Sequence, residues 1–167
     1  MTGIVYGQDI LTPEERQWLA DQPVIHFAPA PNYPPVEFFN EKNEYQGITA
    51  DFIRIIDQQF NFGLKLEIVQ LEDWSEVVAQ ARSRKVDMWG AAEKTPERSK
   101  YMQFTRPYIR LPAVIIVRNE FVGEGIAALE GKKVAGIRDY ASYEHLQEQY
   151  PQLDTIAVPE NLLPNRV

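Results

Sequence analysis

The sequence predicts a globular α/β protein with a mainly parallel sheet. Short apolar segments of strand length alternate along the chain with amphipathic segments of helix length, which is the pattern of βαβ units. Several of the helical segments open with a capping signal. With 167 residues, 44% of them apolar and 25% charged, the chain has an ordinary globular composition and room for one core or two small lobes.

The first elements are a helix and a strand. The segment TPEERQWLA at 12–20 begins with Thr12 as N-cap and Pro13 in the first turn, and Glu15 closes a capping box. The apolar run at 24–30 reads as a strand, and a proline-rich loop through Tyr33 follows it.

The next elements continue the alternation. Residues 48–60 place apolar side chains on one face and predict an amphipathic helix, and 64–69 predict a strand. Asp73 begins a further helix with Glu76 in capping-box spacing. A short strand at 86–92 ends this part.

A second βαβ pattern follows from Leu129. It consists of a strand at 133–138, a helix at 142–149 and a strand at 154–158. Between the two patterns lies a proline-flanked apolar run at 112–118, and we expect the boundary between two lobes within 109–128.

Composition excludes several functions. The net charge of −7 and a pI of about 4.9, without a basic stripe, argue against a nucleic-acid partner. Without cysteine there is no thiolate metal site or cysteine nucleophile, and His26 and His145 are isolated, so we assign no metal, no cofactor and no catalytic residue. No apolar run approaches the roughly 20 residues of a membrane helix, and MTGIVYGQD at the N-terminus does not resemble a signal peptide.

The segment AAEKTPERSKYMQFTRPY at 91–108 is the strongest candidate for a binding motif. Thr95 before a proline predicts a helix start, which places Arg98 in the first turn beyond the strand at 86–92. Ligands of open parallel sheets bind at the carboxyl ends of strands, and a guanidinium there suits a carboxylate. Gly90 and Ala91 leave space for a small ligand. The alternative is that Arg98 is a solvated residue of an ordinary capped helix.

Two aromatic residues strengthen the binding interpretation. Tyr33 follows one strand end and Trp74 starts a helix, so both can lie at the same sheet edge as Arg98. The alternative is that Trp74, at helical spacing, is a core residue.

The order of these segments resembles the bacterial solute-binding protein family 3, and especially the Venus-flytrap sensor domains of BvgS-type histidine kinases. The segments that carry the resemblance are LTPEERQWLADQPVI (11–25), NYPPVEFFNEKNEYQGITADFI (32–53), DWSEVVAQARSRKVDM (73–88), TPERSKYMQFTRPY (95–108) and LEGKKVAGIRDYASYEHLQEQYP (129–151).

The resemblance implies a type II periplasmic binding protein-like fold and a set of site residues. We expect a lead-in segment at 1–23, lobe 1 at 24–111, a hinge at 112–128 and a partial lobe 2 at 129–167. Arg98 matches the arginine that grips a ligand carboxylate, and Tyr33 and Trp74 match the aromatic residues that sandwich the ligand. The remaining implied contacts are the strand end with the turn after it and the helix start of lobe 2, namely Gly90, Ala91, Glu93, Thr95, Tyr140 and Ser142.

Three positions depart from the amino-acid-binding pattern. Ala30 stands where an acidic residue usually meets the ligand's ammonium, Val36 replaces a usual phenylalanine, and Glu93 stands where a serine or threonine is common. Glu93 is close enough in sequence to contact a ligand amine or to occupy Arg98. We also expect the partial second lobe to leave apolar surface that a partner chain or a homodimer would bury.

These observations predict an extracytoplasmic solute-binding domain for a small carboxylate such as an amino acid or organic acid. We expect it to be the sensor domain of a signalling protein, with a kinase or another output domain downstream and with targeting and membrane segments outside this sequence. The alternatives are a free periplasmic component of a transporter and an interaction domain without a ligand. We expect no enzyme; the least favoured alternative is a dehydratase on the same fold with Glu93 as its acid.

Overall fold

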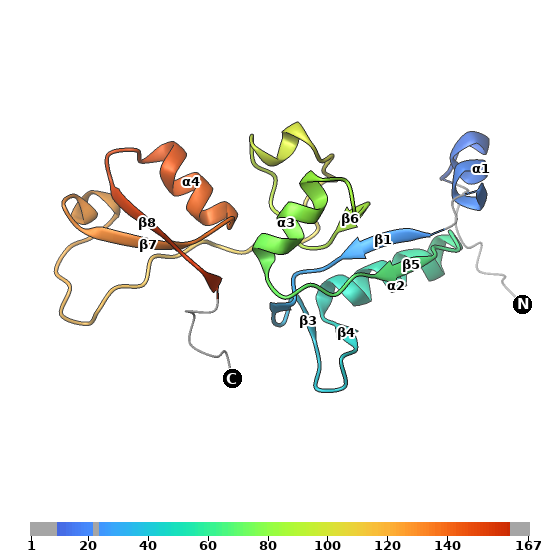
Figure 1. Cartoon of the computed structure of the whole chain (residues 1–167), viewed down its shortest axis with the longest axis horizontal. Helices are drawn as coiled ribbons and strands as arrows, with labels where there is room; N and C mark the ends of the chain where they lie inside the picture. Colours follow the sequence, from blue (N-terminus) through green and yellow to red (C-terminus); the bar gives the residue numbers. More distant parts are fainter. Residues whose placement is uncertain (1–9, 22–23, 161–167) are drawn as a thin grey trace, which may run out of the picture. The chain divides into compact units, whose positions relative to one another are not determined.

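The computed structural model describes residues 10–21 and 24–160, which form two compact units. The first runs to Ala92 and the second begins at Glu93. This division lies upstream of the hinge expected at 112–128, and the four domain ranges expected from the sequence stay predictions. The mixture of helices with parallel strands confirms the predicted α/β class (Figure 1).

The first unit is built on a parallel sheet of order β5-β1-β6. Its strands are β1 (Ile25–Ala28), β5 (Leu66–Ile68) and β6 (Met88–Trp89), with Ile25 opposite Leu66 and Phe27 opposite Met88. The helices α2 (Ile48–Phe60) and α3 (Trp74–Arg82) connect these strands. Because the two connections run to opposite edges of the sheet, right-handed crossovers place α2 and α3 on opposite faces (Figure 1).

The central strand and α3 both contribute buried residues to the core of this unit. Phe27 and Ala28 of β1 are fully buried, and Val77, Val78 and Ala81 of α3 are buried with them. These α3 residues recur at helical spacing, as the sequence pattern requires. The face of α2 that carries Phe52 and Ile55 remains partly exposed.

Capping side chains begin two of the helices as predicted. Before α1 (Pro13–Asp21), the Thr12 Oγ1 accepts a hydrogen bond from the Glu15 N–H at 3.2 Å, and the Glu15 carboxylate accepts from the Thr12 N–H at 2.8 Å. Before α3, the Asp73 carboxylate accepts from the Glu76 N–H at 2.8 Å. The Glu76 side chain reaches Glu72 instead of the Asp73 N–H, so this capping box is shifted by one residue.

The proline-rich loop expected after β1 forms a small antiparallel sheet instead. Its strands are β2 (Asn32–Tyr33), β3 (Glu37–Phe39) and β4 (Tyr45–Gln46), in the order β2-β3-β4. The strands are only two or three residues long, so periodicity does not reveal them. This sheet carries Tyr33 and Glu37 opposite each other.

The second unit contains one parallel βαβ element. The strands β7 (Lys133–Ile137) and β8 (Asp154–Val158) pair over their full length, and α4 (Ala141–Gln149) connects them. At Gly136 a Cβ would lie 2.2 Å from the Tyr143 ring, so this glycine allows α4 to pack closely on β7. Ahead of this element the unit holds two short 3-10 helices, η1 (Arg98–Lys100) and η2 (Ile126–Leu129).

The apolar run at 112–118 adopts no regular secondary structure, and several of its large side chains are exposed. Ile116 is 92% exposed and Val114 is 75% exposed. Among the described residues, no helix combines the length and the hydropathy that crossing a membrane requires.

Candidate functional site

Arg98 is the most deeply buried charged residue of the second unit among those described, with 2% of its surface exposed. Among the described residues, its guanidinium donates to a carboxylate and to backbone carbonyls. Both Nε and Nη2 lie near one carboxylate oxygen, Glu144 Oε1, at 3.2 and 3.1 Å. Nη2 also donates to the Asp139 carbonyl at 2.6 Å, and Nη1 donates to the Glu93 carbonyl at 3.0 Å. The predicted carboxylate clamp therefore holds a carboxylate from α4.

The turn that presents Arg98 begins at Thr95, as the sequence predicts. The Thr95 Oγ1 accepts from the Arg98 N–H at 3.2 Å, and the Thr95 carbonyl accepts from the Ser99 side chain at 2.7 Å. Thr95 is itself buried. The helix expected there is only the three-residue η1, so the arginine is fixed by side-chain contacts more than by a helical scaffold.

Of the two roles considered for the Glu93 carboxylate, occupation of Arg98 is not observed among the described residues, and contact with a ligand amine stays a prediction. The Glu93 carboxylate lies 2.8 Å from His145 Nε2, and only its backbone carbonyl contacts the arginine. Glu144, 46 positions from Arg98, takes that place. Sequence reasoning missed Glu144 because nothing in a helical segment marks which polar side chain meets a distant arginine.

Tyr140 and Ser142 lie at the start of α4, as predicted. Tyr140 is the N-cap residue, and its hydroxyl donates to the Glu160 carboxylate at 2.9 Å. Ser142 is exposed in the first turn. Two acceptors of Arg98 flank these residues in the sequence: the Asp139 carbonyl before them and the Glu144 carboxylate after them. The start of α4 and the arginine therefore form one polar cluster.

A second carboxylate, Glu37, is completely buried in the first unit. Its Oε1 accepts from the Ala30 N–H at 2.9 Å and from the Ala91 N–H at 3.2 Å, and its Oε2 accepts from the Tyr45 hydroxyl at 3.2 Å. The Thr49 side chain adds a fourth hydrogen bond. Burial raises the pKa of Glu37 above its ordinary value, although these four hydrogen bonds act in the opposite direction.

Glu37 occupies the strand end where the sequence predicted ligand contacts. The Ala91 N–H is donated to Glu37, and a Cβ at Gly90 would lie 1.9 Å from Glu37 Oε2. The absence of a side chain at Gly90 therefore leaves room for the Glu37 carboxylate of this chain. Glu37 also accepts a hydrogen bond from the backbone N–H of Ala30. Ala30 is the position where the amino-acid-binding pattern has an acidic residue and this chain does not.

The two predicted aromatic residues differ in their surroundings. Trp74 is buried and its ring lies 5.4 Å from that of Trp89, in a tilted arrangement, so it packs in the core of the first unit. Tyr33 is half-buried on β2. Tyr33, Trp74, Gly90 and Ala91 belong to the first unit, and Glu93, Thr95, Arg98, Tyr140 and Ser142 to the second. A single crevice formed by both sets stays a prediction.

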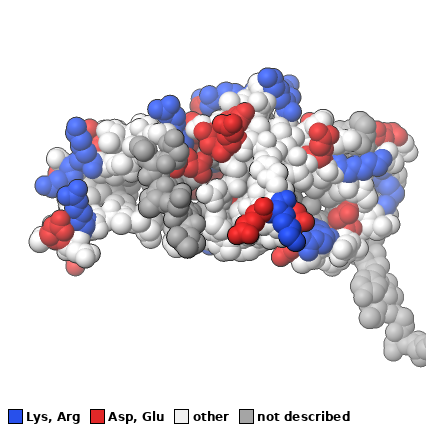
Figure 2. Space-filling model, turned by 60° about the horizontal axis from the view of Figure 1, so that its bottom comes forward, with Lys and Arg blue, Asp and Glu red and all other residues white. Residues whose placement is uncertain are grey.

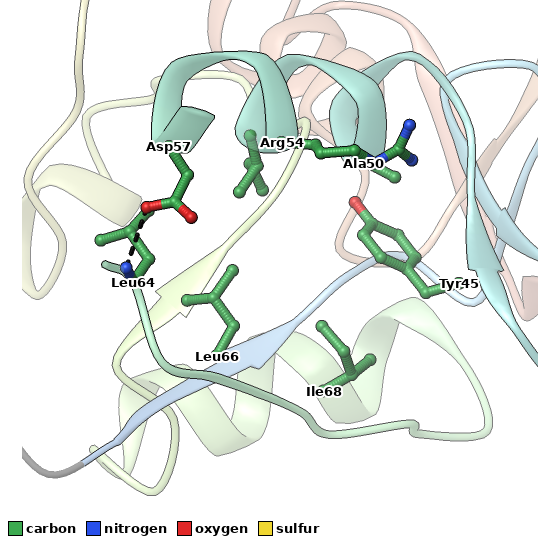
Figure 3. Close-up of a pocket in the computed structure, with 8 residues that line it drawn as sticks. Tyr45, Ala50, Arg54, Asp57, Leu64, Leu66 and Ile68 are labelled. Carbon is green, nitrogen blue, oxygen red and sulfur yellow. Dashed lines mark hydrogen bonds between the residues drawn. The ribbon is translucent and has the colours of Figure 1, made fainter. Parts of the chain in front are cut away.

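The first unit also has a shallow pocket of about 330 Å³ between α2 and β5, which sequence reasoning did not anticipate. Figure 3 shows Leu66 and Ile68 pointing toward α2, and the Asp57 carboxylate accepting a hydrogen bond from the Leu64 N–H at 2.9 Å. None of the predicted site residues lines this pocket. Its wall is mostly aliphatic, with Tyr45, Arg54 and Asp57 as polar members.

Charged side chains on the surface are mixed in sign. Figure 2 shows lysine and arginine side chains interspersed with aspartate and glutamate on the face drawn. The face drawn in Figure 2 is therefore not uniformly basic, and the net charge of the whole chain is −7.

Comparison with known proteins identifies related chains. The virulence sensor protein BvgS of Bordetella pertussis is 33% identical over 152 residues, which cover 90% of this chain and 12% of BvgS. The ABC transporter arginine-binding protein 1 of Escherichia coli is 27% identical over 135 residues, 80% of this chain and 54% of that protein. This chain thus spans about an eighth of the sensor protein and about half of the transport protein.

Solved structures agree with these relatives. The crystal structure of the B. pertussis BvgS periplasmic domain superposes with a TM-score of 0.75 and 30% identity, covering 91% of this chain and 29% of that one. The BvgS periplasmic VFT2 domain superposes with a TM-score of 0.72 and 29% identity, covering 90% and 64%. The fold is therefore that of Venus-flytrap periplasmic binding proteins. Residues 25–151 match the family of bacterial extracellular solute-binding proteins, family 3, and the chain belongs to this family.

Proposed function

We propose that this chain is the extracytoplasmic sensor domain of a signalling protein and that it recognises a small molecule through a carboxylate. Membership of the solute-binding family and 33% identity to the sensor protein BvgS support this proposal. The chain corresponds to only 12% of that relative, so a downstream kinase or other output domain is part of the proposal. The ligand classes that fit are amino acids and organic acids.

The surroundings of Arg98 carry the proposal. A buried guanidinium that holds one carboxylate oxygen through both Nε and Nη2 is a built carboxylate-binding geometry. The two backbone carbonyls on Nη1 and Nη2 fix the plane of the guanidinium. A lysine would supply the charge without this fork.

The family resemblance adds residues of the first unit to the proposal as further ligand contacts. They are Tyr33, half-buried on β2, and the strand end at Gly90 and Ala91, where the Ala91 N–H donates to the buried Glu37. The similarity to an arginine-binding transport protein favours an amino acid as the ligand, with a carboxylate on Arg98. Trp74 contributes by packing against Trp89 and holding the start of α3.

Signalling in this proposal needs no covalent step. A ligand with different affinity for two conformations of the domain shifts their populations, and the output domain reads that shift. The candidate acid of the dehydratase alternative, Glu93, has its carboxylate on His145. We therefore propose binding without catalysis.

The second candidate is an interaction domain without a small ligand. The observation that favours it is that both predicted anchors are occupied by carboxylates of the chain, the Ala91 N–H by Glu37 and Arg98 by Glu144. The exposed apolar side chains around 114–116 suit a partner chain or a homodimer. A free transport component is the third candidate and rests on the arginine-binding relative alone.

A thermal-shift panel tests the first proposal. L-arginine, L-glutamine and succinate are added to the chain and to the variants Arg98→Lys and Arg110→Ala, an exposed arginine that serves as the control. A ligand at about 100 times its dissociation constant adds about 2.7 kcal/mol to the free energy of unfolding. For a chain of this size the melting temperature then rises by about 5 to 11 °C.

The variants decide what the shift means. We expect a ligand to raise the melting temperature of the parent and of the control Arg110→Ala by the same amount. This rise should be lost in Arg98→Lys, because a lysine lacks the fork of N–H donors. An undiminished shift in Arg98→Lys would contradict the assignment of the carboxylate to Arg98. No shift with any of these compounds, in a dilution series up to millimolar concentration, would favour the interaction domain.

A further inference from the structure

The carboxylate of Glu144 uses the same donors of Arg98 that a ligand carboxylate would need. Glu144 Oε1 lies on both Nε and Nη2, while the backbone carbonyls of Asp139 and Glu93 take further N–H groups. A guanidinium has five N–H donors in a fixed plane. A second carboxylate therefore cannot adopt the side-on geometry at Nε and Nη2 unless Glu144 leaves.

Two features make Glu144 replaceable. Only one of its oxygens contacts Arg98; the other, Oε2, is buried and has no hydrogen-bond partner among the described residues. A buried carboxylate oxygen without a donor is costly, so this pair is less stable than a two-oxygen fork would be. Glu144 also lies in the first turn of α4, where the helix dipole favours a negative charge after its release.

The other two acceptors differ from Glu144 because they are backbone carbonyls and not part of a side chain. The carbonyls of Asp139 and Glu93 hold Nη2 and Nη1 at 2.6 and 3.0 Å. They keep the guanidinium oriented whether its carboxylate comes from α4 or from solution. The neighbouring Glu93 carboxylate cannot substitute, because it is paired with His145.

We propose that Glu144 is an intrachain competitor for the carboxylate subsite on Arg98. In the absence of ligand it occupies the arginine and ties α4 to the segment 93–98; a ligand carboxylate binds by replacing it. This inference rests on the proposed carboxylate site. It predicts that Glu144 lowers the apparent affinity of every carboxylate ligand, because only the fraction of molecules with Glu144 released is competent to bind.

Rescue by acetate tests this exchange without a physiological ligand. The melting temperature is measured for the parent, Glu144→Ala, Glu148→Ala and the double variant Arg98→Ala/Glu144→Ala, in sodium acetate and in sodium chloride at equal ionic strength. Glu148 is an exposed glutamate one turn later on α4, so its variant controls for charge and helix propensity.

We expect acetate to stabilise Glu144→Ala in a saturable manner, to stabilise the parent and Glu148→Ala less, and to leave the double variant at its chloride value. At a tenfold excess over its dissociation constant, acetate would raise the melting temperature by about 3 to 6 °C. Equal acetate and chloride curves for Glu144→Ala, or an acetate effect that persists in the double variant, would overturn the proposal.

A second variant covers the case in which Glu144→Ala does not fold. Glu144→Gln keeps the side-chain shape, and its acetate binding is followed by the Arg98 Nε–H resonance of protein labelled with ¹⁵N arginine. A saturable shift there, and a smaller one in the parent, supports the exchange; a resonance that does not respond to acetate overturns it. If the thermal-shift panel fails while acetate rescue succeeds, the ligand proposal is wrong and the role of Glu144 stands.

Discussion

Replacing Glu37 gives the sharpest test of the polar core in the first unit. Glu37→Ala removes the acceptor of the Ala30 and Ala91 N–H groups, whereas Glu37→Gln keeps it. In the glutamine variant, Oε1 accepts from both N–H groups and the amide donates to the hydroxyls of Tyr45 and Thr49, which can reverse their roles. Glutamine is therefore a neutral copy of the protonated glutamate.

The magnitude follows from these contacts. A buried donor left without its acceptor costs about 1 to 3 kcal/mol, and Glu37→Ala leaves one fully buried and one partly buried N–H in that state. We expect the free energy of unfolding of Glu37→Ala to be about 2 to 4 kcal/mol below that of Glu37→Gln. Comparing the two variants with each other removes the contribution of the buried charge.

The pH dependence separates the charge from the hydrogen bonds. Burial raises the pKa of Glu37 in the folded protein above its ordinary value of 4.5, so the folded state holds the proton more tightly than the unfolded state. Between these two pKa values the unfolded state binds fewer protons, and stability falls as the pH rises. The free energy of unfolding of the parent should be closest to that of Glu37→Gln near pH 4.5. At higher pH it should fall below that of the variant.

Urea denaturation at pH 4.5, 5.5, 6.5 and 7.5 measures both effects. The reasoning would be refuted if the free energies of unfolding of the parent and of Glu37→Gln differed by the same amount at all four pH values. It would also be refuted if Glu37→Ala and Glu37→Gln unfolded within about 0.5 kcal/mol of each other, because the two N–H groups would then have no dependence on Glu37.

Three further predictions use the same urea measurement. Val77→Ala should cost about 2 kcal/mol because Val77 is fully buried, while Val114→Ala, at a position 75% exposed, should stay within about 0.5 kcal/mol of the parent; equal losses would contradict the core assignment. Asp73→Ala should lower the free energy of unfolding by about 1 kcal/mol through loss of the α3 cap, and Asp73→Asn should recover most of it. Gly90→Ala should be destabilising because its Cβ meets Glu37 Oε2, and the loss should shrink in a Glu37→Ala background; additive losses would show that the carboxylate is not what it meets.

The sequence alone determined the elements whose signals are local. The helix at 48–60 was predicted with its observed bounds, and the caps at Thr12 and Asp73 were found because side chain and backbone partner lie three residues apart. The alternation of these elements predicted the parallel sheets, and the ordered segments indicated the family that residues 25–151 match. Short-range patterns suffice where the interacting groups are close in the chain.

Only the tertiary structure decided which groups meet in the candidate site. Arg98 was predicted as the anchor, but its carboxylate partner Glu144 lies 46 positions away, and Glu37 reaches the Ala91 N–H across 54 positions. Trp74 had two interpretations, a ligand contact by resemblance and a core residue by spacing; its burial against Trp89 shows the packing, and the ligand contact stays a prediction. A hydrogen bond between distant residues depends on how strands and helices pack, and the residue types of a single sequence leave many equivalent partners open. Glu93 and Glu144 are chemically alike, and packing alone selects the one that holds the arginine.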